Sequence, residues 1–520
     1  MAAGVLAIAG FLSRILGFFR NALLAYFFGA GDVLDAYFLA FRLPDFFFNL
    51  LLFGAFSAGF VPVFIKLRQQ DSEKAWKLTN DILNIALIVF AVFGAVFFVT
   101  APWLLKLIAP GFEGEKMALA VKLSRVMFLQ PVFLGVSVVF SGILQSTQRF
   151  LSYAMAPIFY NIGIIFGILV LNPKMGPIGL AWGVVIGAFL HMMVQYPAAK
   201  ASGFKYRPVF SLRENGIKRI IHIIVPRSLS LILNQLSLVI MAGMASFLGS
   251  GRVSIFNFAN DINSLILGVV AIPLGVAVFP VLAQYASKER FEEFSAAIIK
   301  TLRQLLFLMI PATTLFFVLR AQIVRLTLGY GKFDWVDTVL TIDTLGLFLA
   351  GLIFQGVLAI IMRAFFAIED AKTPFWVLFF GILVSLAVSI LLGPVMDVGA
   401  LALAMSVGAV FNTIVLAFIL EKRLKDLDFS LLFKPIMCLI VSSAVSAISA
   451  YGTLYFVVKY LNTHKVLHLI IQGGTAGLVG ILVFIGMSMF FGIEEIRQLG
   501  SRLKFKGKII LPSLDEETHK

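Results

Sequence analysis

Long apolar stretches, separated by short polar loops, run along almost the whole chain. Most of them reach the roughly 20 residues that an α-helix needs to cross the hydrocarbon core of a bilayer. We therefore predict an all-α polytopic membrane protein with about fourteen transmembrane helices. The predicted segments cover residues 3–28, 33–65, 79–107, 118–146, 151–171, 178–199, 219–248, 253–284, 296–329, 339–367, 375–393, 399–420, 431–458 and 466–491.

Two proline landmarks recur at nearly the same spacing, which indicates an internal repeat. FVPVF ends segment two and VFPVL ends segment eight, so that Pro62 and Pro280 are 218 residues apart. MAPIF and KTPFW place Pro157 and Pro374 217 residues apart. Six segments per copy would set both copies the same way up, as in alternating-access transporters with parallel repeats. We therefore predict two pseudo-symmetric six-helix lobes followed by two C-terminal helices.

The predicted organisation has five parts. Residues 1–199 form the first lobe, 200–218 a cytoplasmic linker, 219–420 the second lobe, 431–491 the added helix pair, and 492–520 a basic cytoplasmic tail.

Helix-breaking residues recur inside the segments. Pro44 lies within segment two and Pro311 within segment nine, while Gly268, Pro273 and Pro280 interrupt segment eight. Such breaks are tolerated in a membrane where neighbouring groups or water satisfy the freed carbonyls. Their repetition favours a protein whose helices bend during a conformational cycle.

Basic residues are concentrated in alternate loops, and this bias orients the chain. With the N-terminus inside, the inside loops and their margins carry 25 Lys and Arg residues, whereas the outside loops carry 6. Both termini are therefore predicted to be cytoplasmic. The bias accounts for most of the formal net charge of +15, which thus indicates topology and attraction to membrane lipids rather than binding of nucleic acid.

The composition excludes a soluble globular protein, because 60% of the residues are hydrophobic and only 13% are charged. Cys438 is the only cysteine, so no intrachain disulfide can form, and the five histidines lack the spacing of metal ligands. The sequence has neither a phosphate-binding loop of the G-x-x-x-x-G-K-S/T kind nor catalytic side chains on a sizeable loop. We therefore expect a transporter that is not an enzyme and holds no cofactor.

Two arginines lie inside the first segment. Arg14 is near its middle, and Arg20 follows less than two turns later. A charge at that depth costs roughly 2.5–3.5 kcal/mol on insertion scales, so such residues usually face a water-filled cavity or a ligand. We therefore predict a cationic interior pathway for an anionic, amphiphilic cargo.

Other ionisable residues within the segments leave more than one interpretation open. Arg42 follows Asp35 by seven residues on one face of segment two, which suits either an ion pair between them or contact of Arg42 with the cargo. Arg227 stands beside Pro226 at the start of segment seven and is a further candidate. The intramembrane acids could bind a cation or relay protons, although their spacing identifies no such site; they are Asp35, Asp45, Asp81, Asp261 and Asp343.

Three stretches of the sequence resemble the MurJ (MviN) family of the MATE-like MOP superfamily. SRILGFFRNALLAYFFGAGDVLDAYFLAFRLPDFF, residues 13–47, is similar to that family's S-R-x-L-G-x-x-R, F-G-A-G and D-A-F/Y motifs, with a proline in the second helix. GAFSAGFVPVF at 54–64 and RAFFAIEDAKTP at 363–374 are the other two. Fourteen segments in two lobes plus a terminal pair also agree, so the resemblance covers essentially the whole chain.

The resemblance implies a flippase for lipid II, the undecaprenyl-diphosphate-linked peptidoglycan precursor. Members move lipid II from the inner to the outer leaflet of the bacterial plasma membrane by alternating access. Arginine suits this cargo, because its planar and permanently charged fork binds phosphate oxygens at two points. The family also implies a groove for the lipid tail at 431–491, and coupling to Na⁺ or to the membrane potential through a site that we cannot place.

The resemblance carries over to named residues only in part. Arg14, Arg20 and Asp35 match positions of the family's cavity residues, Asn260 belongs to the polar part of segment eight, and Arg363 opens the third motif. The candidate substrate-binding residues are therefore Arg14, Arg20, Asp35, Arg42, Arg227, Asn260, Asp261 and Arg363, and no metal ligand is assigned.

Three positions depart from the family pattern. Phe48 stands where the family often has an arginine, Phe53 where a glutamate is common, and Asp261 where helix eight typically carries an arginine. The last departure reverses a charge. Either Arg42 or Arg227 supplies the missing charge, or the cargo is held differently, or the cargo differs. We also predict that Asp261 forms an ion pair with one of these two arginines.

Three other functions remain open. A related exporter would carry another polyprenyl-linked oligosaccharide or a small molecule and would leave lipid II unaffected. A scaffold for cell-wall synthesis partners would tolerate Arg14→Ala and Arg20→Ala, whereas a flippase would not. An enzyme would produce a chemically altered lipid. For the flippase, the expected partners are lipid II, membrane lipids and proteins of cell-wall synthesis, and the chain is expected to be monomeric.

Overall fold

The computed structural model describes residues 2–51, 55–208, 233, 235–461 and 465–496. Within these ranges the regular secondary structure is helical, without strands. Twelve of the described helical stretches are long and apolar enough to cross a membrane. The two remaining predicted segments are segment two, which is described as two helices, and segment seven, of which the described part is little more than the helix Gln235–Ser246. A multi-pass helical membrane protein is therefore confirmed, and the count of fourteen stays a prediction.

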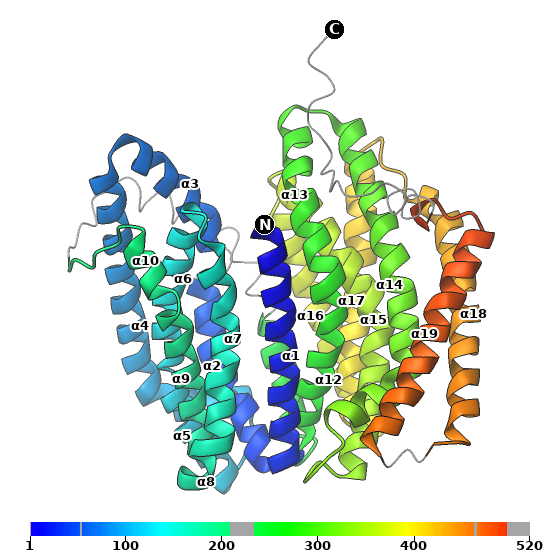
Figure 1. Cartoon of the computed structure of the whole chain (residues 1–520), viewed down its shortest axis with the longest axis horizontal. Coiled ribbons are helices and arrows are strands. Elements are labelled where there is room, and N and C mark those ends of the chain that lie inside the picture. The colour runs from blue at the N-terminus through cyan, green and yellow to red at the C-terminus, as the bar shows by residue number, and fades with distance from the viewer. Residues whose placement is uncertain (1, 52–54, 209–232, 234, 462–464, 497–520) are drawn as a thin grey trace.

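The first bundle holds the helices between residues 32 and 201, at the left of Figure 1. α4 has a well-defined start, because the Asp71 carboxylate accepts hydrogen bonds from the backbone N–H groups of Glu73 (3.0 Å) and Lys74 (3.2 Å). The helices of this bundle are α2 (Asp32–Leu51), α3 (Ala55–Gln70), α4 (Ser72–Ile108), α5 (Gly114–Met127), α6 (Gln130–Ser146), α7 (Phe150–Phe166), the π-helical turn η1 (Gly167–Leu171), α8 (Asn172–Met175), α9 (Ile178–Met193) and α10 (Tyr196–Ala201).

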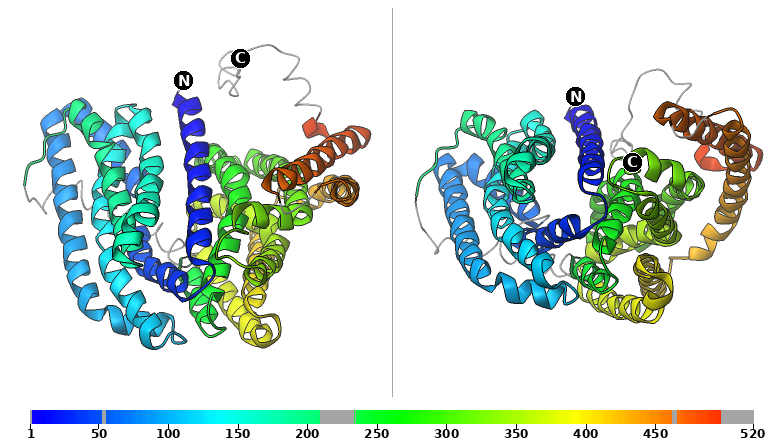
Figure 2. Two further views of the ribbon diagram at one scale, coloured as in Figure 1. Left: turned by 60° about the horizontal axis from the view of Figure 1, so that its bottom comes forward. Right: turned by 90° about the horizontal axis from the view of Figure 1, so that it is seen from below.

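The second bundle stands beside the first, with α1 (Ala2–Phe28) between them in both figures (Figures 1 and 2). α1 packs mainly against α7 of the first bundle. The helices of the second bundle are α12 (Arg252–Ile266), the π-helical turn η2 (Leu267–Ala271), α13 (Ile272–Ser287), α14 (Phe291–Thr327), α15 (Trp335–Ala367), α16 (Lys372–Met396) and α17 (Val398–Arg423). α18 (Phe433–Val458) and α19 (Val466–Phe490) pack against α14 at the outer edge of the molecule (Figure 2).

The order of the helices in the two bundles supports the predicted repeat. Pro62 lies in α3 and its counterpart Pro280 in α13, and Pro157 lies in α7 while Pro374 lies in α16. The helices that follow the first landmark, α4 and α14, are both 37 residues long. The structure therefore agrees with the predicted arrangement of two related lobes followed by an added helix pair.

Opposed glycines let α7 and α9 approach each other closely. A Cβ on Gly163 would lie 2.3 Å from the Cα of Gly187, and a Cβ on Gly167 would lie 2.5 Å from the Cα of Gly183. Small residues in such rows allow the backbones of membrane helices to pack in contact. This packing holds the wall of the first lobe that faces the cavity described next.

Candidate functional site

A cavity of about 1560 Å³ lies between the two lobes. Its wall comes from α1, α2, α6, α7 and α9 on one side and from α12, η2 and α13 on the other. Most of the lining side chains are apolar, which fits a site for an amphiphilic ligand. Its formally charged side chains are Arg14, Arg20, Arg42, Asp45 and Asp261.

The two arginines of α1 hold different partners. Nη2 of Arg14 donates to the backbone oxygen of Gly268 at 2.5 Å, within the π-helical turn η2 of the second lobe. The guanidinium of Arg20 donates to Oδ1 of Asn21 through Nε (3.1 Å) and Nη2 (2.9 Å), and to Oδ1 of Asn161 on α7 through Nη1 (3.3 Å). Arg14 therefore joins the two lobes, whereas Arg20 is held by neutral amides that an anionic ligand can replace.

Asp261 faces Arg20 across the cavity, and Asn21 connects the two. Nδ2 of Asn21 donates to Oδ2 of Asp261 at 2.9 Å, while Oδ1 of the same amide accepts from Arg20. Arg42 donates to Oδ1 of Asn257, one turn before Asp261 on α12. The predicted ion pair between Asp261 and Arg42 is therefore absent from the described part of the chain, and an amide takes its place.

Further polar side chains lie in the first-lobe wall. Oδ1 of Asp45 accepts a long hydrogen bond from Nε2 of Gln130 (3.4 Å). Nδ1 of His191 lies 2.6 Å from Oγ of Ser137, which also accepts from Nε2 of Gln195 at 2.6 Å. Asp45 is bonded to Gln130, and His191, Ser137 and Gln195 are bonded to one another, so these two groups shape the wall and leave the arginines as the groups available to an anion.

At one end the cavity is bounded by a polar junction between the lobes, near the bottom of Figure 1, where α1 ends and α2 begins. Asp35 on α2 is fully buried there. Its Oδ1 accepts from N (2.8 Å) and Oγ (2.7 Å) of Ser254, and its Oδ2 accepts from N of Gly251 (2.7 Å) and Nζ of Lys116 (2.7 Å). Lys116 also pairs with Asp32 at 2.7 Å. We call these five residues, Asp32, Asp35, Lys116, Gly251 and Ser254, the Asp35 junction.

Backbone contacts extend this junction. N of Ala30 donates to Oδ2 of Asp337 at 2.9 Å, and N of Lys332 donates to O of Tyr26 at 2.9 Å. Ala30 and Tyr26 belong to the chain around the end of α1, whereas Asp337 and Lys332 belong to the second lobe. The lobes are thus tied at this end by these two contacts as well as by the hydrogen bonds that Gly251 and Ser254 donate to Asp35.

Three further predicted site residues, Asp35, Asn260 and Arg363, lie apart from the cavity wall. Asp35 is in the junction and pairs with Lys116, so the ion pair with Arg42 that its spacing allowed is not formed. Arg363 donates to the backbone oxygen of Ala359 on its own helix, at 2.8 Å, and packs against Gly275 of α13. Asn260, half-buried, and Arg363 do not contribute to the lining. Arg227 lies outside the described residues.

A family model described as lipid II flippase MurJ matches residues 24–472. The chain belongs to the MurJ family. The lipid II flippase MurJ of Burkholderia cenocepacia is 30% identical over 430 residues, which cover 81% of this chain and 83% of that protein. The probable lipid II flippase MurJ of Rhizobium tropici is 30% identical over 493 residues, 92% of this chain and 90% of its own length.

Solved structures agree with the MurJ assignment. A lipid II flippase MurJ in an inward closed conformation has a TM-score of 0.78 at 25% identity, and the match covers 94% of this chain and 99% of that one. An inward-facing multidrug resistance MATE transporter of the MOP superfamily has a TM-score of 0.68 at 16% identity, over 79% and 94% of the two chains. The second likeness shows the fold alone.

Two of the three departures from the MurJ pattern fall in the cavity wall. Phe48 and Asp261 both line the cavity. Phe53 lies outside the described residues. The cavity of this MurJ protein therefore presents three arginines against two aspartates, a weaker positive charge than its arginines alone would give.

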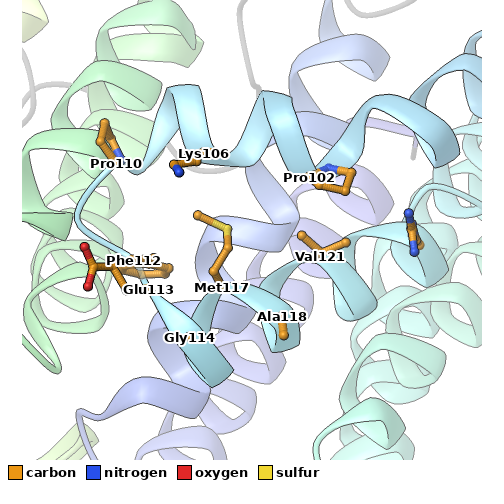
Figure 3. A pocket seen from close by; sticks show the side chains of 10 residues that line it. Pro102, Lys106, Pro110, Phe112, Glu113, Gly114, Met117, Ala118 and Val121 are labelled. Carbon is orange, nitrogen blue, oxygen red and sulfur yellow. The ribbon is translucent and has the colours of Figure 1, made fainter.

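A second hollow of about 620 Å³ lies between the end of α4 and the start of α5. Figure 3 shows Met117 of α5 pointing towards Lys106 of α4 there. Arg125 also lines this hollow, but its Nε donates to O of Phe98 at 2.9 Å. Lys106 is thus a cation outside the central cavity and serves below as a control position.

Three residues of this MurJ site gave no usable signal in the sequence. Asn21 and Asn161 hold Arg20, yet single amides in apolar segments are common packing residues. Lys116 falls between the predicted segments 79–107 and 118–146, where a lysine is expected to be solvated, although it is the counter-ion of Asp35. In the described residues no three His, Cys, Asp or Glu side chains gather to hold a metal ion, and coupling to Na⁺ stays a prediction.

Proposed function

We propose that this protein flips lipid II from the inner to the outer leaflet of the bacterial plasma membrane by alternating access. The observation that carries the proposal is the arginine-containing cavity between two lobes in a chain of the MurJ family. Charge-assisted hydrogen bonds from a planar guanidinium fork are well matched to phosphate oxygens. We assign the contact with the diphosphate to Arg14, Arg20 and Arg42 and the contact with the apolar part of the cargo to the rest of the wall.

The contacts between the lobes suit a cavity that opens alternately to the two sides. At the Asp35 junction the lobes are tied by the hydrogen bonds that Gly251 and Ser254 of the second lobe donate to Asp35, and these bonds can break and re-form as a unit. Arg14, by contrast, joins the lobes through one hydrogen bond to Gly268, which a phosphate oxygen can replace. In this proposal, cargo first takes Arg14 from Gly268, and the outer end opens when the Asp35 junction parts.

Orientation, assembly and the tail groove belong to the same proposal. The bias of basic residues supports an orientation with both termini in the cytoplasm and the Asp35 junction at the outer face. We infer that α18 and α19, at the edge of the second lobe (Figure 2), hold the isoprenoid tail. Their exposed apolar side chains, among them Ile448 and Leu478, support this assignment. The chain is proposed to act as a monomer.

Complementation tests the proposal. Bacteria depleted of their own lipid II flippase are given this chain, and the lipid II accessible on the outer face of the membrane is measured. We expect exposure to be restored, to be lost again with Arg14→Ala, and to be kept with the control Lys106→Ala. Absence of restoration despite confirmed expression and membrane insertion would contradict the proposal.

A related exporter is the second candidate, and Asp261 is the observation that favours it. A carboxylate in the cavity wall lowers the attraction for a diphosphate and could suit a different cargo. Transport of another polyprenyl-linked sugar, with lipid II exposure unchanged, would decide for this candidate.

A further inference from the structure

Asp261 has an unusual connection to its counter-charge. Nδ2 of Asn21 donates to Oδ2 of Asp261 at 2.9 Å, and Oδ1 of Asn21 accepts from Nη2 of Arg20 at 2.9 Å. Among the described residues, the Asn21 amide is the one group that donates a hydrogen bond to the Asp261 carboxylate. Arg20 therefore balances the negative charge of the carboxylate without touching it, because the neutral Asn21 amide lies between them.

Arg42 is the second cation near Asp261. It lies on α2 and donates to Asn257, one turn earlier on α12. Its Nε is buried and has no acceptor in the described structure. The cations whose charge acts on Asp261 are Arg20 and Arg42. The same two arginines are the groups that the proposed cargo would engage.

We propose that Asp261 is a proton-binding site that fills when cargo binds. This inference rests on the proposed function. Once phosphate oxygens occupy the N–H groups of Arg20 and Arg42, the carboxylate faces a dianion within a poorly solvated cavity. Like charges at close range disfavour ionisation, so the carboxyl group takes up a proton. The protonated carboxyl group also gains an O–H donor, which a phosphate oxygen can accept.

Asp45 on α2 is the other carboxylate of the cavity wall and lies near the same two arginines, so the comparison of the wild type with Asp261→Asn assigns the uptake to Asp261. The titratable and charged groups that face it are Arg20 from α1 and Arg42 and Tyr37 from α2. α14, α15 and α17 also pack against α12, and they bring no charged group that acts on it. Asp35 on α2, which accepts hydrogen bonds from Ser254 at the start of α12, stays in the junction with Lys116 as its counter-ion.

The consequence concerns the charge that crosses the membrane. A diphosphate diester carries two negative charges at neutral pH, and a co-transported proton offsets one of them. The loaded protein would then move less charge through the field than the cargo alone, and cargo affinity would fall as the pH rises. Proton and cargo would travel together, which makes the flippase a symporter for the proton.

Calorimetry on the purified full-length chain in detergent tests the inference. The probe is a synthetic farnesyl-diphospho-N-acetylglucosamine, a diphosphate diester that does not titrate near neutral pH. Binding heats measured in two buffers of different ionisation enthalpy give the number of protons taken up. We expect the wild-type chain to take up about one proton more per ligand than Asp261→Asn. The affinity of the wild type should fall by up to about tenfold per pH unit, and that of Asp261→Asn should stay level.

Two further variants serve as controls for the calorimetry. Asp261→Glu keeps a carboxyl group and should keep the proton uptake. Asp343→Asn removes an exposed carboxylate of α15 and should behave as wild type. Equal proton uptake by the wild type and Asp261→Asn, with ligand bound to both, overturns the inference and leaves the proposed function standing. Failure of every variant and of the wild type to bind the probe overturns the proposed function, and the inference with it.

Discussion

Asp35 and Asp261 are carboxylates on facing helices of the two lobes, and their surroundings differ sharply. Asp35 accepts four hydrogen bonds, from Lys116, from Gly251 and twice from Ser254. Asp261 accepts one described hydrogen bond, from the Asn21 amide. A buried charge is tolerated when ion pairs and hydrogen bonds replace its lost water. Asp35 meets that condition within the protein, whereas Asp261 meets it only partly.

The difference separates two tasks. The surroundings of Asp35 hold both of its carboxylate oxygens in one geometry, which suits a group that holds the lobes together. Asp261 accepts one described hydrogen bond, and the arginines that balance its charge, Arg20 and Arg42, also line the cavity. These surroundings suit a group that responds to cargo. The predictions below exchange or remove these features, and they run from the largest expected effect to the smallest.

Asp35→Asn should break the junction. The neutral side chain offers one acceptor oxygen in place of two to Gly251 and Ser254 of the second lobe. It also leaves Lys116, on the same lobe as residue 35, without a buried counter-ion, and breaking a buried pair typically costs about 3–5 kcal/mol. We expect the lobes to separate at this end and transport to be lost. Spin labels at the exposed positions Glu115 and Val395, in a background where Cys438 is serine, report the separation as an interspin distance.

The wild type should give one narrow distance distribution, and Asp35→Asn a longer or broader one. Asp261→Asn serves as the matched control, because it removes a carboxylate from the cavity and leaves the junction intact. An unchanged distribution in Asp35→Asn would mean that the backbone contacts of Ala30 and Tyr26 suffice to hold the lobes.

Arg20→Ala should lower transport by between about 10-fold and 100-fold. A hydrogen bond to a charged group contributes about 1.5–3 kcal/mol, and each 1.4 kcal/mol corresponds to a factor of ten. Arg20→Lys keeps the charge without the fork and should fall between the alanine variant and the wild type. Exposure of lipid II on the outer face, at matched expression, is the measurement. Alanine and lysine variants of equal activity would show that the fork is not used.

The sequence predicted well those features that depend on the membrane itself. Charges inside an apolar segment need a polar cavity, so Arg14, Arg20, Arg42 and Asp261 could be assigned to the interior from sequence, and all four line the cavity. Spans follow from length and hydropathy in the same way. The internal repeat was visible because proline is confined to few positions in a helix.

The pairing of side chains was beyond the sequence. Asp35 and Arg42 share a helix face, yet tertiary packing brings Lys116, 81 residues away, to Asp35 and turns Arg42 towards Asn257. Spacing along a helix restricts which groups can meet on that helix and says nothing about the helix packed against it. For the same reason, Arg363 in a recognisable motif packs against Gly275 instead of facing the cavity.

Gly251→Ala should weaken the junction by a smaller amount than Asp35→Asn. Gly251 has φ of +83°, and a Cβ there would lie 2.5 Å from the backbone oxygen of Ala30. Gly249 has φ of +113° and nothing within 4 Å of such a Cβ, so Gly249→Ala is a control with backbone strain and no clash. We expect Gly251→Ala to cost about 1–3 kcal/mol more than the control, as overpacking does. The thermal unfolding midpoint and the interspin distance of Gly251→Ala and Gly249→Ala measure this difference. Equal effects of the two substitutions would contradict a close contact between the lobes at Gly251.

Asp32→Asn should have the smallest effect, although Asp32 pairs with the same lysine. The hydrogen bond from Lys116 lowers the pKa of Asp32 below its usual 3.8. A lowered pKa means that the ion pair stabilises the junction above pH 4 and that this contribution is lost as the pH falls through the lowered value. The Asp32 side chain is 59% exposed, so water and salt screen the pair and its contribution should stay below about 1 kcal/mol. Unfolding midpoints of wild type and Asp32→Asn should therefore differ slightly at pH 7 and converge below pH 4. A loss at pH 7 as large as that of Asp35→Asn would show that Lys116 needs both carboxylates, and Asp35 would no longer be the group that holds the lobes together.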